Sequence, residues 1–184
     1  MTTALLVIDI QNDYFPGGAM ECVGANAACA QAAKLIGAFR EQRRPVLHVQ
    51  HLSLRPGATF FLPGTPGAEI HSGVRPVGDE PVFKKHFPNA FRETALLEHL
   101  RLSKISGLVI AGMMTHMCID TTTRAAADFG FSCSLAHDAC ATRTLAFNGV
   151  QVPAESVQAA YLAGLNGLFA KVRPVGELLT ELRP

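Results

Sequence analysis

Short runs of apolar residues alternate along the chain with segments in which apolar residues recur every three or four positions. The first pattern is typical of buried β-strands and the second of amphipathic helices. Their alternation predicts a parallel sheet with helices packed on both faces. The predicted strands cover residues 4–10, 45–50, 81–84, 107–111, 132–136 and 169–172. We therefore expect a three-layer, doubly wound α/β fold with a six-stranded, mostly parallel sheet.

Five helices are predicted between and after these strands. In residues 26–42, Ala28, Ala32, Leu35 and Phe39 share one helical face. The other four helices are predicted from apolar positions within residues 94–100, 119–129, 157–168 and 175–182.

Residues 54–81 show neither period and contain five prolines and five glycines. A loop of this length inside a domain is more often functional than not. The alternative is a structural Ω-loop that covers a sheet edge or a subunit interface. Nothing in the chain resembles a repeat or an interdomain linker, so we expect one domain over residues 1–184.

Composition narrows the class of protein. Hydrophobic residues make up 48% of the 184 positions and charged residues 17%, which favours a globular protein over a disordered one. The net charge of +1, without a cluster of basic residues, gives no indication of a nucleic-acid or membrane-surface partner. No apolar run reaches the roughly 18 residues of a membrane span, and the N-terminus lacks the pattern of a signal peptide. The five cysteines are odd in number and include no CxxC pair, which favours a reduced, cytoplasmic protein.

Three reactive side chains follow three of the predicted strands. Asp9 ends the first, Lys84 and Lys85 end the third, and Cys118 lies in the first turn of the helix after the fourth. In a doubly wound sheet, ligands bind beyond the carboxyl ends of the strands. A helix N-terminus also favours thiolate over thiol. We therefore expect a nucleophilic, ionised Cys118 with an acid/base and a cation beside it.

Each group also has an ordinary interpretation. Asp9 could bind loop amides, Cys118 could be a small buried apolar residue, and the lysines could be solvated surface groups. The combination favours catalysis, because thiolate chemistry needs a base and a compensating charge.

Four segments make the chain resemble the isochorismatase-like cysteine hydrolases, a superfamily that includes nicotinamidases, N-carbamoylsarcosine amidase and ureide hydrolases. Together they span nearly the whole chain. They are LLVIDIQNDYFPGG (residues 5–18), EPVFKKHFPNAFRETALLEHL (80–100), VIAGMMTHMCIDTTTRAAADFGF (109–131) and DACAT (138–142).

The resemblance implies a catalytic triad of Asp9, Lys85 and Cys118. Lys85, rather than Lys84, has the family's six-residue spacing to the following Phe91. It also implies a cis peptide bond between Met113 and Met114.

An oxyanion hole made of the backbone N–H groups of Met114 and Cys118 is implied as well. Tyr14 stands where relatives place an aromatic residue beside the substrate. We also expect Phe60 and His116 to line the pocket, although His116 could equally be a helix-surface histidine.

Histidines raise the question of a metal. Relatives that bind one carry Asp-x-His after the second strand, whereas His51 and Ser53 stand at those positions here. His48, His71 and His86 show no paired spacing with a carboxylate, so we expect neither a metal nor another cofactor. This departure makes nicotinamide itself a doubtful substrate.

The sequence thus predicts a cysteine hydrolase that cleaves a C–N bond of a small amide or ureide through a thioester. Vinyl-ether hydrolysis of the isochorismate type is the alternative within the family, although enzymes of that kind commonly lack the cysteine. A non-catalytic protein whose thiol serves redox sensing or binding is the alternative outside it. The resemblance also implies a homodimer or homotetramer acting on a small molecule.

Overall fold

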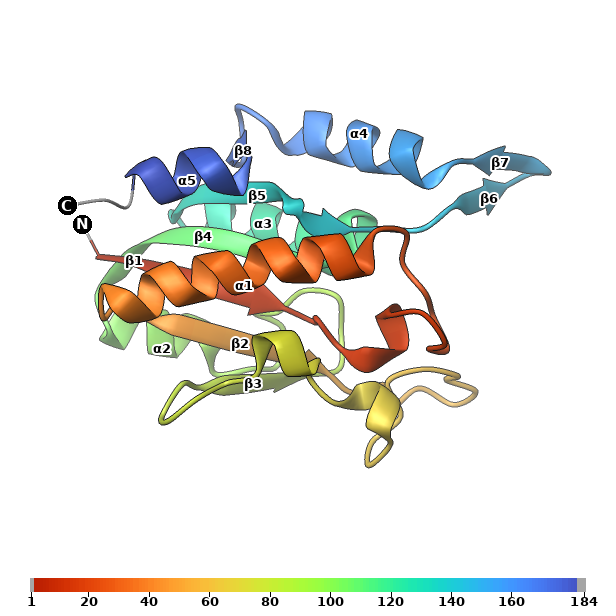
Figure 1. The fold of residues 1–184 in the computed structure, drawn as a ribbon, viewed down its shortest axis with the longest axis horizontal. Helices are drawn as coiled ribbons and strands as arrows, with labels where there is room; N and C mark the ends of the chain where they lie inside the picture. The colour runs from red at the N-terminus through yellow and green to blue at the C-terminus, as the bar shows by residue number, and fades with distance from the viewer. Residues whose placement is uncertain (1, 182–184) are drawn as a thin grey trace.

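A six-stranded sheet with the strand order β3-β2-β1-β4-β5-β8 forms the centre of the computed structural model, which describes residues 2–181 (Figure 1). All five pairings between neighbouring strands are parallel. The α/β class and the six strands expected from the sequence are confirmed. The strands are β1 (Thr2–Ile8), β2 (Val46–His51), β3 (Val82–Lys85), β4 (Ile105–Met113), β5 (Ser132–Ala141) and β8 (Lys171–Arg173).

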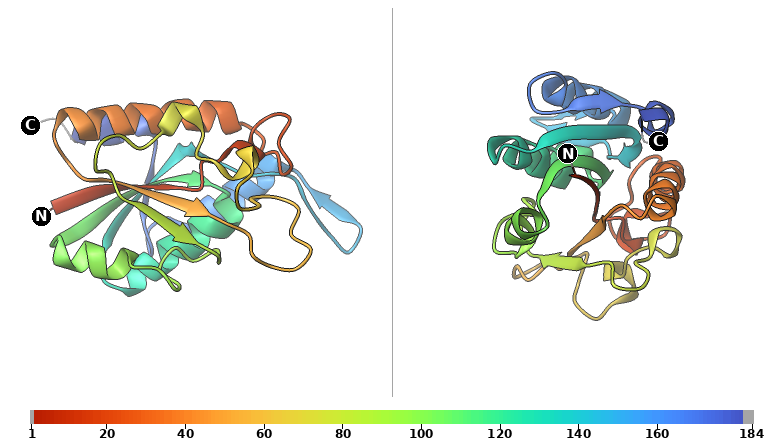
Figure 2. Two further views of the ribbon diagram at one scale, coloured as in Figure 1. Left: turned by 90° about the horizontal axis from the view of Figure 1, so that it is seen from below. Right: turned by 90° about the vertical axis from the view of Figure 1, so that its left-hand side faces the viewer.

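Helices cover both faces of the sheet, as Figure 2 shows from below and from one end. One face packs against α1 (Ala25–Glu41) and α5 (Val175–Glu181). The other face packs against α2 (Leu96–Leu102), α3 (Asp120–Asp128) and α4 (Ala154–Leu165). All five expected helices are present; residue 182, the expected end of the last one, lies outside the described residues. None of the helices within residues 2–181 has the length and apolarity needed to cross a bilayer.

The central strand β1 divides the apolar core into two layers. Leu5 and Val7 belong to the cluster beneath α1, whereas Ala4, Leu6 and Ile8 belong to the cluster on the opposite face. All five are nearly inaccessible to solvent. A strand buried on both faces reads as a continuous apolar run, which explains the pattern of the sequence here.

The strand order of the sheet reverses between β1 and β4. Strands β2 and β3 lie on one side of β1, whereas β4, β5 and β8 lie on the other. This reversal of strand order opens a crevice at the carboxyl ends of β1 and β4. Gly112 lets the two ends approach, since a Cβ there would lie 1.9 Å from the carbonyl oxygen of Ile8.

The long loop after β2 is fastened to the segment that follows β1. It contains two short 3-10 turns, Pro66–Ala68 and Ser72–Val74. The backbone N–H of the buried Phe61 donates to the carboxylate of Asp13, and the Phe61 ring packs edge-on against Tyr14. The loop therefore lies over the crevice.

A two-stranded antiparallel hairpin, β6 (Leu145–Phe147) and β7 (Val150–Val152), extends away from the sheet (Figure 1). The sequence analysis assigned no element to this segment. Its turn is formed by Asn148 and Gly149, both with positive φ, a pair that favours tight hairpin turns.

Candidate active site

Four adjacent strands each direct one polar side chain to the same crevice. Lys85 ends β3, His51 ends β2, Asp9 follows β1, and β4 leads into the turn that carries Cys118. His51 and Lys85 are also direct partners in the register of β2 and β3. The three residues expected to form the triad are therefore brought together, with His51 as a fourth member.

Lys85 lies at the centre of this group. Its ammonium nitrogen is 2.7 Å from Oδ2 of Asp9, 3.2 Å from Sγ of Cys118 and 3.0 Å from the carbonyl oxygen of Phe87. Burial alone would lower the pKa of Lys85, but Asp9 and Cys118 outweigh it, so the pKa lies above its ordinary value and the group stays charged. The neighbouring Lys84 is exposed, which agrees with the choice of Lys85 from the motif.

Asp9 presents a buried carboxylate with spare acceptor capacity. Its side chain is completely inaccessible to solvent and forms an ion pair with Lys85. Apart from this ion pair, neither oxygen has a hydrogen-bond partner among residues 2–181. A carboxylate oxygen lies within 4.8 Å of the sulfur of Cys118. Asp9 can therefore accept a proton from the thiol without breaking another hydrogen bond.

Cys118 lies in a π-helical turn, Thr115–Ile119, that leads directly into α3. Its side chain is only 4% exposed, and its sulfur borders the pocket. Burial and the nearby Asp9 raise the pKa of Cys118 above its ordinary value, and the opposing effect of Lys85 is smaller. Burial and Asp9 therefore favour the thiol over the thiolate, opposite in direction to the effect expected from the helix N-terminus, and a carboxylate oxygen of Asp9 lies close enough to take the proton.

His51 is a further neighbour of the triad residues, and its contact with Lys85 was not predicted from the sequence. Its Nδ1 accepts a hydrogen bond from the Lys85 ammonium at 2.9 Å, so the neutral ring carries its proton on Nε2. Gln11 fixes the backbone of His51 by bonds to both its N–H and its carbonyl, at 2.7 and 2.9 Å. The available signal was its position at a strand end, equivalent to that of Asp9.

We expect His51 to titrate far below an ordinary histidine. Burial first, and then the charge of Lys85, lower its pKa to about 4. Removing that charge in Lys85→Met should move the NMR titration midpoint of His51 upward toward its ordinary range. The control Lys84→Met should leave it unchanged, since Lys84 is an exposed neighbour. An unaltered midpoint in Lys85→Met would contradict the contact.

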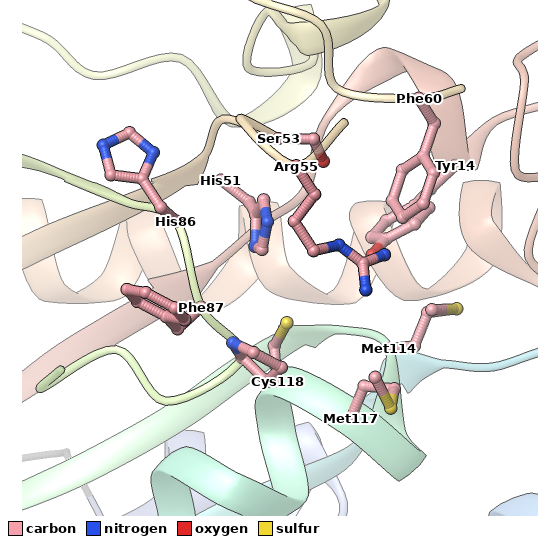
Figure 3. Close-up of a pocket in the computed structure, with 11 residues that line it drawn as sticks. Tyr14, His51, Ser53, Arg55, Phe60, His86, Phe87, Met114, Met117 and Cys118 are labelled. Carbon is pink, nitrogen blue, oxygen red and sulfur yellow. The ribbon is translucent and has the colours of Figure 1, made fainter. Parts of the chain in front are cut away.

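A pocket of about 200 Å³ opens above the sulfur (Figure 3). Tyr14 and Phe60 line it, as expected, and the ring centroids of these two residues lie 6.2 Å apart. The other lining residues are His51, Ser53, Arg55, His86, Phe87, Pro88, Met114, Met117 and Cys118. At roughly 20–30 Å³ per non-hydrogen atom, this space holds a molecule of about ten such atoms or fewer.

His116 does not line this pocket, so the structure does not support its expected contact with substrate. Its Nδ1 lies 2.6 Å from the hydroxyl of Thr142, and its ring meets Tyr161 edge-on. The helical turn directs His116 away from Cys118 toward α4. The alternative of a helix-surface histidine fits this position.

The peptide bond between Met113 and Met114 is cis, where the resemblance places it. Met114 lines the pocket together with Cys118. The two residues whose N–H groups are expected to form an oxyanion hole therefore line the same pocket.

Only one group of three potential metal ligands occurs within residues 2–181: Asp9, His51 and Cys118. The ammonium of Lys85 contacts all three, so a covalently attached cation already lies among them. His71, another of the histidines weighed as metal ligands, stacks on Phe15 with the ring centroids 3.8 Å apart, and its Nδ1 lies 3.5 Å from the sulfur of Cys29.

The chain is similar to known proteins along most of its length. The family model of the isochorismatase domain matches residues 3–173. The isochorismatase family protein YddQ of Bacillus subtilis is 50% identical over 173 residues, covering 94% of this chain and 96% of that protein. The solved structure of an isochorismatase hydrolase from Oleispira antarctica is 50% identical, with a TM-score of 0.94 over 97% of this chain and 96% of that one.

More distant relatives have named activities. Streptothricin hydrolase of Streptomyces noursei is 34% identical over 139 residues, covering 76% of this chain and 49% of that enzyme. Nicotinamidase 3 of Arabidopsis thaliana is 28% identical over 151 residues, covering 76% of this chain and 73% of that enzyme. Since the family model spans nearly the whole chain and the fold matches along its length, the chain belongs to the isochorismatase-like hydrolases.

Proposed function

We propose that this protein hydrolyses a C–N bond of a small amide or ureide through a thioester on Cys118. The observation that carries the proposal is the contact between Lys85, Asp9 and Cys118 at the floor of a small pocket. A nucleophile, a base and a cation lie within reach of one bound carbonyl group. A nicotinamidase and a streptothricin hydrolase among the relatives support hydrolysis of this kind.

The first half of the reaction forms the thioester. Asp9 takes the proton of the Cys118 thiol as the sulfur attacks the carbonyl carbon, and the Lys85 ammonium stabilises the developing thiolate. The oxyanion lies against the backbone N–H groups of Met114 and Cys118. Asp9 then returns its proton to the leaving nitrogen, the C–N bond breaks, and ammonia or an amine departs.

The second half clears the thioester. Asp9, again a carboxylate, takes a proton from water while the water oxygen attacks the thioester carbonyl. The C–S bond breaks, the sulfur leaves as the thiolate beside Lys85, and Asp9 returns the proton to it. The products are a carboxylic or carbamic acid and the thiol with which the reaction began.

The position of the sulfur favours this reaction over vinyl-ether hydrolysis. Proton transfer to a vinyl ether needs the carboxylic acid but no nucleophilic sulfur, whereas Cys118 here lies at the pocket floor beside a buried base. A thiol kept only for packing would not need an ion pair beside it.

The test is an ammonia-release assay over a panel of small amides, ureides and nicotinamide, with isochorismate as the competing substrate. We expect ammonia from at least one amide or ureide. After an acid quench, the protein should be heavier by the mass of one acyl group, located on Cys118. Consumption of isochorismate without ammonia from any panel member would instead show ether hydrolysis.

A further inference from the structure

One cation in the pocket has no role in the chemistry described so far. Arg55 lies on the loop after β2 and lines the pocket. Figure 3 shows its side chain directed from the loop into the pocket, toward the side that holds Cys118. Among residues 2–181, no carboxylate lies within the 4.0 Å that defines an ion pair with its guanidinium.

The backbone places Arg55 on the same side of the chain as the triad. His51, Ser53 and Arg55 line the pocket, whereas the intervening Leu52 and Leu54 do not. This alternation is that of an extended segment, which continues the direction of β2. The backbone N–H of Ser53 donates to the carbonyl of Phe61 at 2.9 Å, which holds the segment in place.

Ser53 and Arg55 add polar groups to a pocket that also has apolar lining residues. The Ser53 hydroxyl and the Arg55 guanidinium offer donors, and no side-chain hydrogen bond within residues 2–181 uses either of them. Tyr14, Phe60 and Met117 lie among the apolar residues of the pocket. A guanidinium with a hydroxyl beside it matches the geometry of a carboxylate.

The charge of the pocket has the same sign as Arg55. None of its eleven lining residues is acidic. The charge of Asp9 is already balanced by Lys85 at 2.7 Å, and Glu93, which lines a neighbouring hollow together with Arg55, forms its ion pair with Arg92. After burial, Lys85 and His86, Arg55 makes the smallest of the contributions that lower the pKa of His51, which agrees with its place in the same pocket.

From this arrangement we propose that Arg55, with Ser53, binds an anionic group of the substrate, so that the substrate is a small amide or ureide that carries a carboxylate. The reacting carbonyl lies at Cys118 and the carboxylate lies at the loop side of the pocket. Arg55 is then a specificity residue, and the proposal that the bound molecule is hydrolysed rests on the function proposed above.

Matched substrates test the substrate class. Succinamate and succinamide differ only in whether one end is a carboxylate or a neutral amide, and N-carbamoylglycine and N-carbamoylglycinamide form the same comparison for a ureide. We expect wild-type kcat/KM to favour the charged member of a pair by about 10-fold or more. Arg55→Met should lose about 100-fold on the charged member and little on the neutral one, and Arg55→Lys should retain part of the preference. A wild-type preference for the neutral members would overturn the proposal.

A second measurement tests anion binding even if no amide is hydrolysed. Iodoacetate and iodoacetamide have nearly the same shape, and only the first carries a charge. The rate of alkylation of Cys118 by iodoacetate, divided by the rate with iodoacetamide, should fall about 10-fold in Arg55→Met. Peptide mass spectrometry follows both rates. The control Arg75→Met removes an exposed arginine of the same loop that does not line the pocket, and it should leave the ratio unchanged.

The two measurements separate the two ideas. A lower ratio in Arg55→Met, without hydrolysis of any amide, would keep the anion site and reject the proposed reaction. Hydrolysis of amides, with the same ratio in wild type and Arg55→Met, would keep the reaction and overturn the role of Arg55.

Discussion

Replacing Cys118 by alanine is expected to lower amide turnover by on the order of 10⁴-fold or more while the protein remains folded. The sulfur is the nucleophile that attacks the substrate in the proposed reaction, and it lies 3.2 Å from the ammonium nitrogen of Lys85. Removing it leaves the ion pair of Asp9 and Lys85 intact. Turnover is followed by ammonia release, and folding by circular dichroism and the thermal midpoint.

The matched control is Cys133→Ala. Cys133 is equally buried, but it lies on β5 and does not line the pocket. Its activity should stay within a few-fold of wild type. Near-normal turnover in Cys118→Ala would remove the thiol from the mechanism, whatever the control shows.

Neutralising one member of the buried ion pair is expected to lower the free energy of unfolding by about 3–5 kcal/mol. Asp9 and Lys85 are both inaccessible to solvent and lie 2.7 Å apart, so Asp9→Asn or Lys85→Met leaves an uncompensated charge in the core. The double variant, which removes both charges, should be more stable than the sum of the two single losses predicts. Urea denaturation measures the free energy of unfolding of the two single variants and the double variant.

Activity and stability should separate in this series. All three variants should lose turnover, because each lacks the proton acceptor or the cation, whereas the double variant recovers stability. The exposed Lys84→Met should change neither quantity appreciably. Additive losses of stability in the double variant would show that the two charges do not depend on each other.

The architecture could be predicted because its signal is local. A strand segment buried on both faces must lack polar side chains, and this holds for Ala4–Ile8 in β1 and for Gly107–Met113 in β4. The ends of the strands were harder to predict. The strand β5 continues to Ala141 past an irregularity in its pairing with β4, and the run of apolar residues in the sequence does not reveal this continuation. The hairpin of β6 and β7 was missed because its strands are short and mostly exposed, although Asn148-Gly149 was a usable turn signal.

Site residues could be predicted where a sequence motif fixes their spacing. They could not be predicted where their environment depends on contacts between residues far apart in the sequence. Asp9, Lys85 and Cys118 followed from their motifs. The direction in which the pKa of Cys118 is shifted did not, because burial depends on residues far away in the sequence. His116 likewise turns toward Thr142, which is 26 positions away. The contact between His51 and Lys85 spans 34 positions and depends on β2 and β3 being neighbours.

The proposed catalytic residues and the proposed anion-binding residue Arg55 lie in different parts of the molecule. Asp9 and Lys85 are held at the ends of buried strands, whereas Arg55 lies on an exposed stretch that no strand constrains. Single substitutions along that stretch can change which substrate is preferred without disturbing Asp9, Lys85 or Cys118. Related proteins can thus differ in the substrates they accept while they keep the same catalytic residues.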